Sequence, residues 1–493
     1  MKFPLFGLFK KQATPTTSPL FLYNTLAKDT QRFELPAGAS KVRMYNCGPT
    51  VYDTQHIGNL SMFVFADILR RTLEYHGFEV KQVINITDVG HLTSDADEGE
   101  DKMTKGLKRE GLKPSLESMR QLADKYTDIF LGDIATLNID TSRITFPRAS
   151  DYIAAQVAMI EALEQKGYAY RTDDGVYYDT SRFSAYGALG GIDLEGLKEG
   201  ARVATVSGKR HPTDFALWKL DKKIGWESPW GKGFPGWHIE CSAMIRKTLG
   251  EQIDIHTGGI EHIPVHHNNE IAQSEAATGK RPLSRFWLHR SHIQIDGGKL
   301  AKSKGKVVYL SDVRDRGFHP LSLRYLFLGA HYRSNSNFSW DALEASQTAF
   351  LRLRTLVQSA PEGGSISESY RTAIMERIDD DLDTPGALSK IWEMTKDESV
   401  SPADMRATIA DIDRIFGLRL AEEDELAVSI SAAQFGRTVT SDELPEEILL
   451  LIEERERARS DKNWARADEV RSELLEKGYT IDDRPEGPLI RVR

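Results

Sequence analysis

The sequence has little cysteine and no long apolar segment. Its 493 residues include only two cysteines, Cys47 and Cys241. This excludes a disulfide framework and favours a reducing compartment, so we expect a cytoplasmic protein. No apolar run approaches the roughly 20 residues that cross a bilayer, and we predict no membrane span. The opening MKFPLFGLFKK lacks a small-residue cleavage site, which predicts a weakly surface-active tail rather than a signal peptide.

An excess of positive charge is also missing. Lysine and arginine number 64 against 73 aspartates and glutamates, which gives a net charge of −9. A generic nucleic-acid binder is broadly basic, so any contact with RNA must use a local basic patch. The hydrophobic share of 40% is ordinary for a globular protein, and the length suggests about three compact units.

The N-terminal half begins with a strand–helix–strand pattern. KVRMYNCGPTVYD predicts a strand that runs into a Gly-Pro turn, and FEVKQVINITDV predicts a second buried strand. Between them, apolar residues recur at helical spacing: Met62, Phe65, Ala66, Leu69 and Leu73. This βαβ unit predicts an α/β, Rossmann-like parallel sheet, whose ligands bind at the carboxyl ends of the strands.

The rest of the chain changes character twice. Two helical stretches and a Gly-centred hairpin predict an inserted connective domain at about 114–230. Helical patterns at 340–359, 370–381, 385–395 and 402–416 predict a bundle. We therefore expect a flexible N-terminal extension at 1–19, an α/β domain at 20–330, a helical bundle at 331–420, a linker at 421–443 and a C-terminal unit at 444–493.

The loop GPTVYDTQHIGN, residues 48–59, joins the first predicted strand to its helix. Taken alone, such a loop is more often an ordinary turn. Here His56, Gly58 and Asn59 fall at the start of a helix, where N–H groups and the helix dipole favour an anion. Gly58 permits close approach of the backbone, and His56 can donate a hydrogen bond to a phosphate. The loop therefore indicates a nucleotide site.

A second candidate is KLAKS, residues 299–303, with glycines on both sides. Most lysine-rich loops are simply solvated. Lys299 and Lys302, on a hinged loop, have the reach to bind a polyphosphate as point charges. Together with His56 they favour phosphoryl or nucleotidyl chemistry.

A third candidate is the segment VHHNNE, because His266 and Glu270 share a helix face at a spacing that suits two ligands of one ion. His267 pairs with Ile271 at the same offset, so His266 is the better candidate. A solvated surface pair is the alternative. Added to Cys47 and Cys241, these residues make a zinc ligand set of thiolates, imidazole and carboxylate. The ligands lack CxxC spacing, so the prediction depends on the fold.

Several segments occur together and in order: CGPTVYDTQHIG, NITDV, PGWHIECSAM, VHHNNEIAQS, KLAKS and WARADEVRSELLEKGYTIDD. In this combination the chain resembles the cysteinyl-tRNA synthetases, class I aminoacyl-tRNA synthetases, from about residue 20 to its end. The resemblance implies a Rossmann catalytic domain with a connective insertion, a helical bundle and a C-terminal anticodon-binding domain. It implies activation of L-cysteine by ATP, with Mg²⁺, to cysteinyl adenylate, and transfer to tRNA-Cys. We expect the protein to be a monomer.

The resemblance also implies residue roles. Zinc, which would select the substrate thiolate, is assigned the ligands Cys47, Cys241, His266 and Glu270. The nucleotide signatures HIGH and KMSKS supply the catalytic His56, Asn59, Lys299 and Lys302, and the ATP site adds Gly48, Gly58 and Ser303. The cysteine pocket is assigned Thr87, Trp237 and His256. Two positions depart from the pattern: Asn59 replaces the last histidine of HIGH, and Ala301 replaces the inner serine of KMSKS.

Two other functions remain open on sequence. A cysteine ligase of thiol biosynthesis resembles the same catalytic domain but lacks a C-terminal RNA-binding unit. The basic residues of 444–493 favour the tRNA enzyme, although acidic residues are interleaved with them. A non-catalytic zinc- and RNA-binding paralogue is the other alternative, and the retained His56, Lys299 and Lys302 argue against it.

Overall fold

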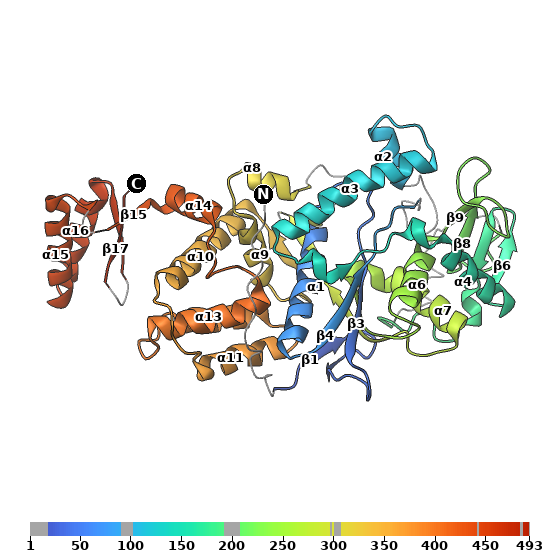
Figure 1. Cartoon of the computed structure of the whole chain (residues 1–493), viewed down its shortest axis with the longest axis horizontal. Helices are drawn as coiled ribbons and strands as arrows, with labels where there is room; N and C mark the ends of the chain where they lie inside the picture. Colours follow the sequence, from blue (N-terminus) through green and yellow to red (C-terminus); the bar gives the residue numbers. More distant parts are fainter. Residues whose placement is uncertain are drawn as a thin grey trace, which may run out of the picture.

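Three blocks lie in a row along the molecule (Figure 1). The computed structural model describes residues 18–89, 102–191, 208–295, 298–299, 307–440, 443–483 and 487–492. A block built on a parallel sheet occupies one side, a helical bundle lies in the middle, and a small C-terminal unit lies at the far end. No helix in these ranges combines the length and apolar character needed to cross a membrane.

The first block is organised around a five-stranded parallel sheet with the order β11-β10-β3-β4-β5. Its strands are β3 (Lys41–Asn46), β4 (Glu79–Ile84), β5 (Ile144–Thr145), β10 (Ile253–Gly259) and β11 (Ser284–Arg290). The prediction of a parallel α/β sheet is confirmed. Because the strand order reverses at β3, a crevice opens beyond the carboxyl ends of β3 and β10, where such sheets bind their ligands.

Helix α1 (Ile57–Tyr75) connects β3 to β4 and completes the predicted βαβ unit. Its apolar side chains recur every three or four residues, and Leu60, Leu69 and Leu73 are fully buried. Two residues after the helix ends, Gly77 adopts a φ of 86°, a left-handed conformation that glycine accepts without strain. The helix therefore places its N-terminus, with His56, at the crevice.

The insertion forms a four-stranded antiparallel sheet, β6-β7-β8-β9, packed against helix α4. The elements are α4 (Ile153–Gln165), β6 (Ala169–Thr172), β7 (Gly175–Tyr178), β8 (Phe215–Leu220) and β9 (Gly233–Pro235). The hairpin predicted from YAYRTDDGVYYD is β6–β7. The predicted start of the insertion, near residue 114, differs from the structure. Helix α3 (Leu116–Thr136) packs in the core of the first block, and β5 extends the parallel sheet.

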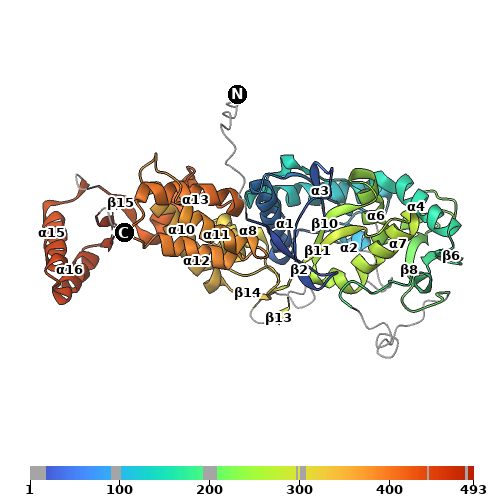
Figure 2. The same cartoon turned by 90° about the horizontal axis from the view of Figure 1, so that it is seen from below.

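The central bundle contains five helices, α9 (Pro320–Leu328), α10 (Trp340–Ser359), α11 (Glu368–Asp379), α12 (Thr384–Met394) and α13 (Pro402–Phe416). Four were predicted, and α10 and α13 have the predicted bounds. The bundle lies between the parallel sheet and the C-terminal unit (Figure 2). Smaller elements complete these blocks: β1 (Phe21–Asn24), β2 (Asp29–Arg32), α2 (Lys102–Arg109), β12 (Ile293–Ile295), β13 (Gly298–Lys299), α8 (Leu310–Asp315) and β14 (Ser336–Phe338).

A buried ion-pair cluster joins the bundle to α1. Arg324 of α9 has no exposed surface, and its Nη2 donates to Asp67 Oδ2 of α1 at 2.6 Å. The same guanidinium donates to the carbonyl oxygens of Leu137 at 2.8 Å and Phe416 at 2.6 Å. One side chain therefore holds the ends of α3 and α13 against the helix that carries His56.

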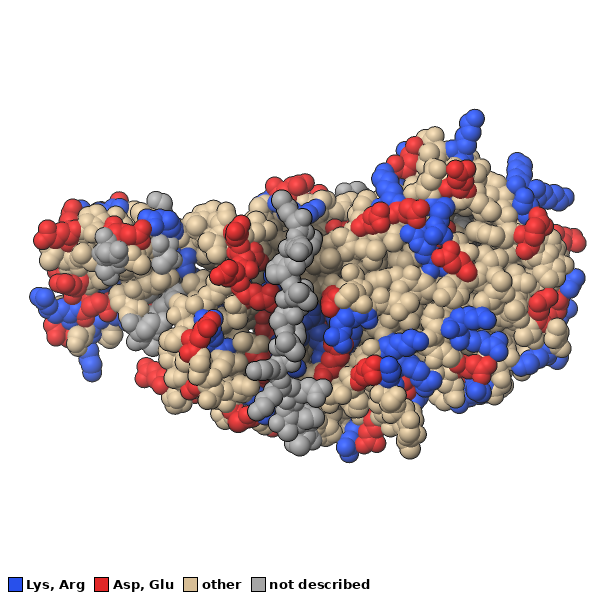
Figure 3. Space-filling model, viewed as in Figure 1, with Lys and Arg blue, Asp and Glu red and all other residues tan. Residues whose placement is uncertain are grey.

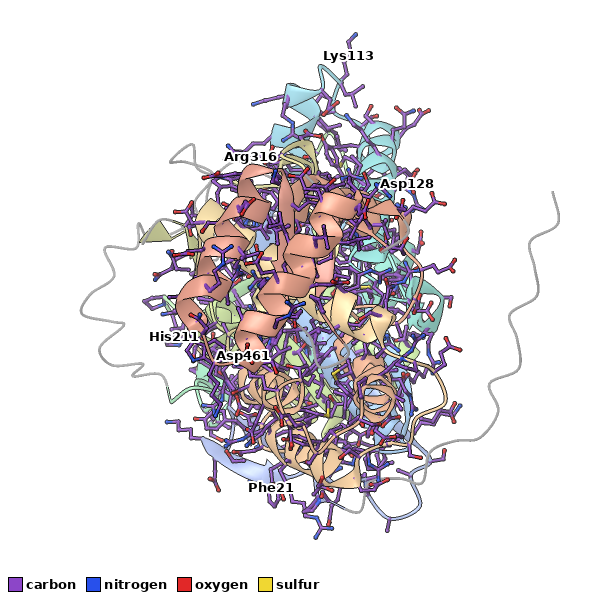
Figure 4. The ribbon with its side chains drawn as sticks, turned by 90° about the vertical axis from the view of Figure 1, so that its left-hand side faces the viewer. Phe21, Lys113, Asp128, His211, Arg316 and Asp461 are labelled. Atoms are coloured by element: carbon purple, nitrogen blue, oxygen red, sulfur yellow. The ribbon has the colours of Figure 1, made fainter. Side chains whose placement is uncertain are left out.

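The C-terminal unit pairs helices α15 (Glu446–Ser460) and α16 (Trp464–Glu476) with the antiparallel sheet β15-β17-β16. Its strands are β15 (Arg437–Val439), β16 (Tyr479–Asp482) and β17 (Leu489–Val492). Seen end-on in Figure 4, the two helices lie in front, with Asp461 at the turn between them. On the face that Figure 3 shows, basic and acidic side chains are interspersed.

The segment 421–443, predicted as a linker, contains regular structure. Helix α14 (Glu425–Phe435) packs on the bundle through the buried Ala427, and β15 pairs with β17 of the C-terminal unit. A helix that is apolar around much of its circumference lacks clear 3.6-residue periodicity, which is why the sequence pattern did not reveal it. The first 17 residues, most of the predicted N-terminal extension, lie outside the described residues.

Candidate active site and metal centre

A cavity of about 360 Å³ opens at the carboxyl ends of the parallel strands. Nine of the predicted site residues line it: Cys47, Gly48, His56, Gly58, Asn59, Thr87, Trp237, Cys241 and His266. They come from the ends of β3 and β4, from the start of α1 and from two later helices. The fold thus brings together residues about 220 positions apart in sequence, such as Cys47 and His266.

His56 is the N-cap of α1. Its Nδ1 accepts a hydrogen bond of 3.2 Å from the Asn59 backbone N–H. This acceptor role fixes the tautomer of the neutral ring, so that Nε2 carries the proton. Since no acidic residue occupies the first turn of α1, the positive end of the helix is not neutralised from within the helix. The cap and the helix dipole together favour an anion here.

Asn59 uses its side chain inside the loop. Its Nδ2–H donates to Gln55 Oε1 at 3.0 Å, and Gln55 Nε2 in turn donates to the carbonyl oxygens of Thr50 and Asp53 at 3.3 and 3.1 Å. The asparagine at the position of the last histidine of the signature therefore stabilises the loop that leads into α1. One of its donors is committed to that loop.

Gly48 allows two strand ends to touch. A Cβ at this position would lie 1.6 Å from the carbonyl oxygen of Asn85, so no other residue fits without a backbone shift. The Gly48 N–H donates to Asn85 Oδ1 at 2.8 Å, and Asn85 Nδ2 donates to Thr87 Oγ1 at 3.1 Å. The turn after β3 thereby positions Thr87 in the cavity wall.

Four potential metal ligands converge at the base of the cavity. One donor atom each from Cys47, Cys241, His266 and Glu270 lies within 4.8 Å of the others, and all four residues are buried. Cys47 follows β3, and Cys241 lies in the first turns of α6 (Trp237–Thr248). His266 belongs to a π-helical turn, Ile263–His267, that continues into α7 (Asn268–Thr278).

The predicted pairing of His266 with Glu270 is present, at 2.7 Å between Nε2 and Oε1. The helix start is π-helical rather than α-helical, a local form that often marks functional sites. Glu270 has no exposed surface and lies behind the cavity wall. The alternative of a solvated surface pair is therefore wrong.

Electrostatic interactions link the side chains of this cluster. Burial raises the pKa of the Glu270 carboxyl, but His256 and His266 outweigh that effect and hold it below its usual value. Burial lowers the pKa of His266, yet Glu270 and Cys241 raise it to about 10. A hydrogen bond from Cys47 lowers the pKa of the Cys241 thiol, while burial raises that of Cys47. An ionised carboxylate and an imidazolium thus neutralise each other in the core.

His256, predicted to line the cysteine pocket, lies one layer deeper. It is fully buried in β10, and its Nε2 lies 2.6 Å from Glu270 Oε2, while its ring stacks on Trp287. It is not among the described residues that line the cavity. Trp237 and Thr87 do line it, and the Trp237 ring lies 4.3 Å from the His266 ring.

A hydrogen-bonded chain reaches Cys47 from the N-terminal strands. His267 Nε2 lies 3.3 Å from Cys47 Sγ, and its Nδ1 lies 2.8 Å from His289 Nε2. His289 Nδ1 lies 2.8 Å from the Thr25 hydroxyl. The sequence pattern favoured His266 over His267 and did not single out His289 or Thr25, because these contacts join segments far apart in the chain. Doubled histidines in VHHNNE were the only local signal.

The donor set fits zinc better than a hard cation. Two thiol sulfurs, one imidazole nitrogen and one carboxylate oxygen match the ligands that zinc prefers, whereas Mg²⁺ and Ca²⁺ select oxygen. The surrounding imidazoles resemble the outer partners that orient metal ligands in proteins.

The predicted lysine loop is described only at its edge. Gly298 and Lys299 form β13, which pairs with β12 in antiparallel fashion. The side chain of Lys299 and all of Lys302 and Ser303 lie outside the described residues. Ala301, the other departure from the signature, lies there too.

The sheet, its strand-end cavity and the nucleotide loop on α1 define a class I aminoacyl-tRNA synthetase fold. The family model of the class I (C) tRNA synthetase catalytic domain matches residues 34–348, and that of the cysteinyl-tRNA ligase anticodon binding domain matches residues 441–491. The chain belongs to the cysteine–tRNA ligase family.

Relatives support this placement over nearly the whole length. Cysteine–tRNA ligase 1 of Burkholderia lata is 47% identical over 95% of this chain and 96% of its own. Cysteine–tRNA ligase of Treponema denticola is 42% identical over 94% of this chain and 98% of its own. The structure of Mycobacterium tuberculosis methionyl-tRNA synthetase with methionyl-adenylate shares the fold, with a TM-score of 0.54 and 14% identity over 80% of this chain and 91% of that one.

Proposed function

We propose that this protein ligates L-cysteine to tRNA-Cys in two steps, with ATP as the energy source. Cysteine and ATP give cysteinyl adenylate and diphosphate, and the cysteinyl group then passes to the terminal adenosine of tRNA-Cys. The observation that carries the proposal is the convergence of Cys47, Cys241, His266 and Glu270 in the cavity that also contains the nucleotide loop. A soft metal centre beside a phosphate-binding helix end suits a thiol substrate and ATP.

The residues of the cavity form two groups, one that binds ATP and one that binds the amino acid. His56, with its proton on Nε2, and the N-terminus of α1 favour the phosphates of ATP, which Mg²⁺ would accompany. Adenylate formation needs no side-chain nucleophile, because the substrate carboxylate attacks the α-phosphorus itself. Catalysis is therefore positioning and charge stabilisation. Thr87 and Trp237 in the wall, with the four donor residues beneath them, form the amino-acid side.

Zinc held by Cys47, Cys241, His266 and Glu270 would supply a strong, directional bond to sulfur and lower the pKa of the substrate thiol. An apolar pocket separates amino acids that differ by one small group by only roughly 10–200-fold. A site built around a specific bond rejects a mimic by about 10⁴-fold or more. Serine is then excluded without an editing domain.

Four protein ligands usually mark a closed zinc site, whereas substrate binding needs an open position. Cysteine binding would therefore require room for a fifth ligand beside Cys47, Cys241, His266 and Glu270, or displacement of Glu270. X-ray absorption at the zinc edge, with and without cysteine, tests this. A selector role requires one additional sulfur neighbour with cysteine and none with serine.

The deciding experiment measures ATP–diphosphate exchange with cysteine or serine, and then the charging of purified tRNA-Cys. Cysteine-dependent exchange is expected from a cysteine–tRNA ligase and from a cysteine ligase of thiol biosynthesis, but not from an inactive paralogue. Charging of tRNA-Cys separates this protein from a cysteine ligase of thiol biosynthesis. The match to the anticodon binding domain at 441–491 supports the tRNA enzyme. If the protein stripped of metal activates serine as well as cysteine, the proposed selection by zinc is wrong.

A further inference from the structure

Arg290 is a buried cation at the edge of the cavity. It ends β11, is 5% exposed and lines the cavity together with residues of the nucleotide loop. Within the described ranges, the only hydrogen bond of its side chain runs from Nε to Ser61 Oγ at 2.9 Å. The guanidinium lies 5.8 Å from the centre of the Phe327 ring, and no carboxylate pairs with it. Arg70, the other described arginine of the first block with comparably little exposure, has Asp67 and Glu74 as acidic partners.

The neighbours of Arg290 link it to α1. Ser61 Oγ accepts from Arg290 Nε, and its own hydroxyl donates to the Gly58 carbonyl oxygen at 2.7 Å. Gly58 belongs to the first turn of the helix that His56 caps. Arg290 is therefore held in register with the nucleotide loop, although it lies more than 200 residues later in the sequence.

A buried charge without a partner is costly to the protein. Burial lowers the pKa of Arg290 to about 10, so the guanidinium stays protonated at neutral pH. A buried guanidinium without an acidic partner is therefore expected where an anionic ligand binds and supplies the missing negative charge. Its planar fork matches two oxygens of a phosphate, a geometry that a lysine or a histidine does not reproduce.

We propose that Arg290 is a catalytic residue of this enzyme. Its guanidinium binds the triphosphate of ATP in the nucleotide half of the cavity. The proposal rests on the proposed function. Ser61 and Gly58 hold the guanidinium beside the helix N-terminus, whereas the amino-acid side lies over the four donor residues. Asn59, where the signature has a histidine, is neutral and bonded to Gln55. Arg290 supplies a cation to this part of the site.

The positive charge of Arg290 interacts with the negative charge that develops on the leaving group during the reaction. A carboxylate oxygen of cysteine forms a bond to the α-phosphorus, and the bond from that phosphorus to the bridging oxygen breaks. The bridging oxygen takes the electron pair and leaves as part of diphosphate. Negative charge therefore grows on the β- and γ-phosphates, and Arg290 stabilises it more in the transition state than in the bound ATP.

The test uses the full-length, metal-loaded protein with Arg290→Gln and Arg290→Lys. In cysteine-dependent ATP–diphosphate exchange, Arg290→Gln is expected to lower kcat/KM for ATP by about 10- to 100-fold. KM for cysteine and zinc content should stay within about twofold of the unaltered protein, given that the metal ligands are untouched. Arg290→Lys should lose less activity than Arg290→Gln, because lysine keeps the positive charge but lacks the planar, two-pronged guanidinium. The control, Arg285→Gln, changes an arginine of the same strand that pairs with Asp254.

A second measurement is independent of turnover. Inorganic tripolyphosphate with Mg²⁺ should raise the melting temperature of the unaltered protein and of Arg285→Gln, but not that of Arg290→Gln. Without the anion, Arg290→Gln should melt at the same temperature or higher, because it removes a charge without a partner. A lower melting temperature together with unchanged ATP kinetics would make Arg290 a structural residue and overturn the proposal.

The outcomes separate the two proposals. No cysteine-dependent exchange by the unaltered protein defeats the proposed function, while the tripolyphosphate shift still reports on Arg290. Normal exchange by Arg290→Gln with slower charging of tRNA-Cys would assign Arg290 to an RNA phosphate and overturn its assignment to ATP. A raised KM for cysteine alone would assign it to the amino-acid carboxylate, with the same consequence.

Discussion

His256 Nε2 donates a hydrogen bond of 2.6 Å to Glu270 Oε2, from a ring that has no exposed surface. The other carboxylate oxygen, Oε1, lies 2.7 Å from His266 Nε2. Because Glu270 accepts on both oxygens, its carboxylate is fixed in orientation at the base of the cavity. We infer that His256 positions a proposed metal ligand, since it contacts Glu270 and is not among the described residues that line the cavity.

The first prediction concerns His256. Replacement by leucine removes the donor to Glu270 and should weaken zinc binding by about 10- to 100-fold, as loss of an outer partner does in other zinc sites. His256→Gln keeps an N–H group and should recover part of the affinity. Competition with a chromogenic chelator measures the affinity. His211→Leu, an exposed histidine labelled in Figure 4, is the control and should change nothing.

This experiment also tests the role that the resemblance assigns to His256. Unchanged zinc affinity with a higher KM for cysteine would support the assignment of His256 to the amino-acid pocket. Weaker zinc binding, with a KM for cysteine that recovers at saturating zinc, would support positioning of Glu270.

The second prediction concerns Thr25, the far end of the hydrogen-bonded chain to Cys47. A metal-bound thiolate only accepts, so His267 must donate from Nε2 and accept at Nδ1 from His289 Nε2. His289 Nδ1 then accepts from the Thr25 hydroxyl. Thr25→Val leaves that nitrogen without its donor. Zinc release into excess chelator should become about 2- to 10-fold faster, the worth of one hydrogen bond.

Thr30→Val, an exposed threonine of the neighbouring strand β2, is the matched control. Nitrogen NMR of labelled histidines gives a second readout, since the chain requires the Nε2–H tautomer at both His267 and His289. An Nδ1–H tautomer at His267 in the zinc-loaded protein would contradict the direction of the chain.

The sequence predicted the parts of the fold that have strong local patterns. The periodic apolar residues of α1 and the buried segments on either side gave the βαβ unit. Strand β5, with two residues, is too short to show alternation, so the start of the insertion was placed too early. Helix α14 lacks a polar face of the usual period and was taken for part of a linker.

The residues of the candidate site likewise include some with a local sequence signal and some without one. His266 and Glu270 were found because four residues separate them on one helix, and Cys47 and Cys241 because cysteine is so scarce. Thr25, His289 and Arg290 gave no such signal. Their importance lies in contacts between distant strands and in burial, neither of which a linear pattern expresses.

The third prediction concerns the KLAKS loop. Lys302→Ala should lower ATP–diphosphate exchange far more than it weakens the binding of cysteine, because a lysine on this loop would interact with phosphates and not with the amino acid. Exchange kinetics give the first quantity, and equilibrium dialysis of labelled cysteine gives the second. Lys304→Ala, in the same loop but outside the signature, is the control. Equal losses in both measurements would make the loop structural.

The fourth prediction concerns Asp67, the acidic centre of the cluster between α1 and the bundle. It accepts from Arg70 at 2.5 Å, Arg71 at 2.7 Å and Arg324 at 2.6 Å, and all its side chain is buried. Burial raises its pKa, but the three arginines outweigh that and lower it from 3.8 to about 2. Asp67→Asn removes the carboxylate that pairs with the fully buried Arg324, whereas Arg70 keeps Glu74. Breaking such a buried pair costs about 3–5 kcal/mol.

Calorimetry should show a clear fall in melting temperature for Asp67→Asn, and little change for Asp128→Asn, an exposed aspartate of α3 labelled in Figure 4. The sign with pH follows from the lowered pKa. Stabilisation by Asp67 is complete above the unfolded-state pKa near 3.8 and is lost as pH falls toward 2. The difference between the two variants should therefore be constant from pH 7 to about 5 and shrink below about pH 4. A difference that shrinks already near neutral pH would show that Asp67 is not held ionised by Arg70, Arg71 and Arg324.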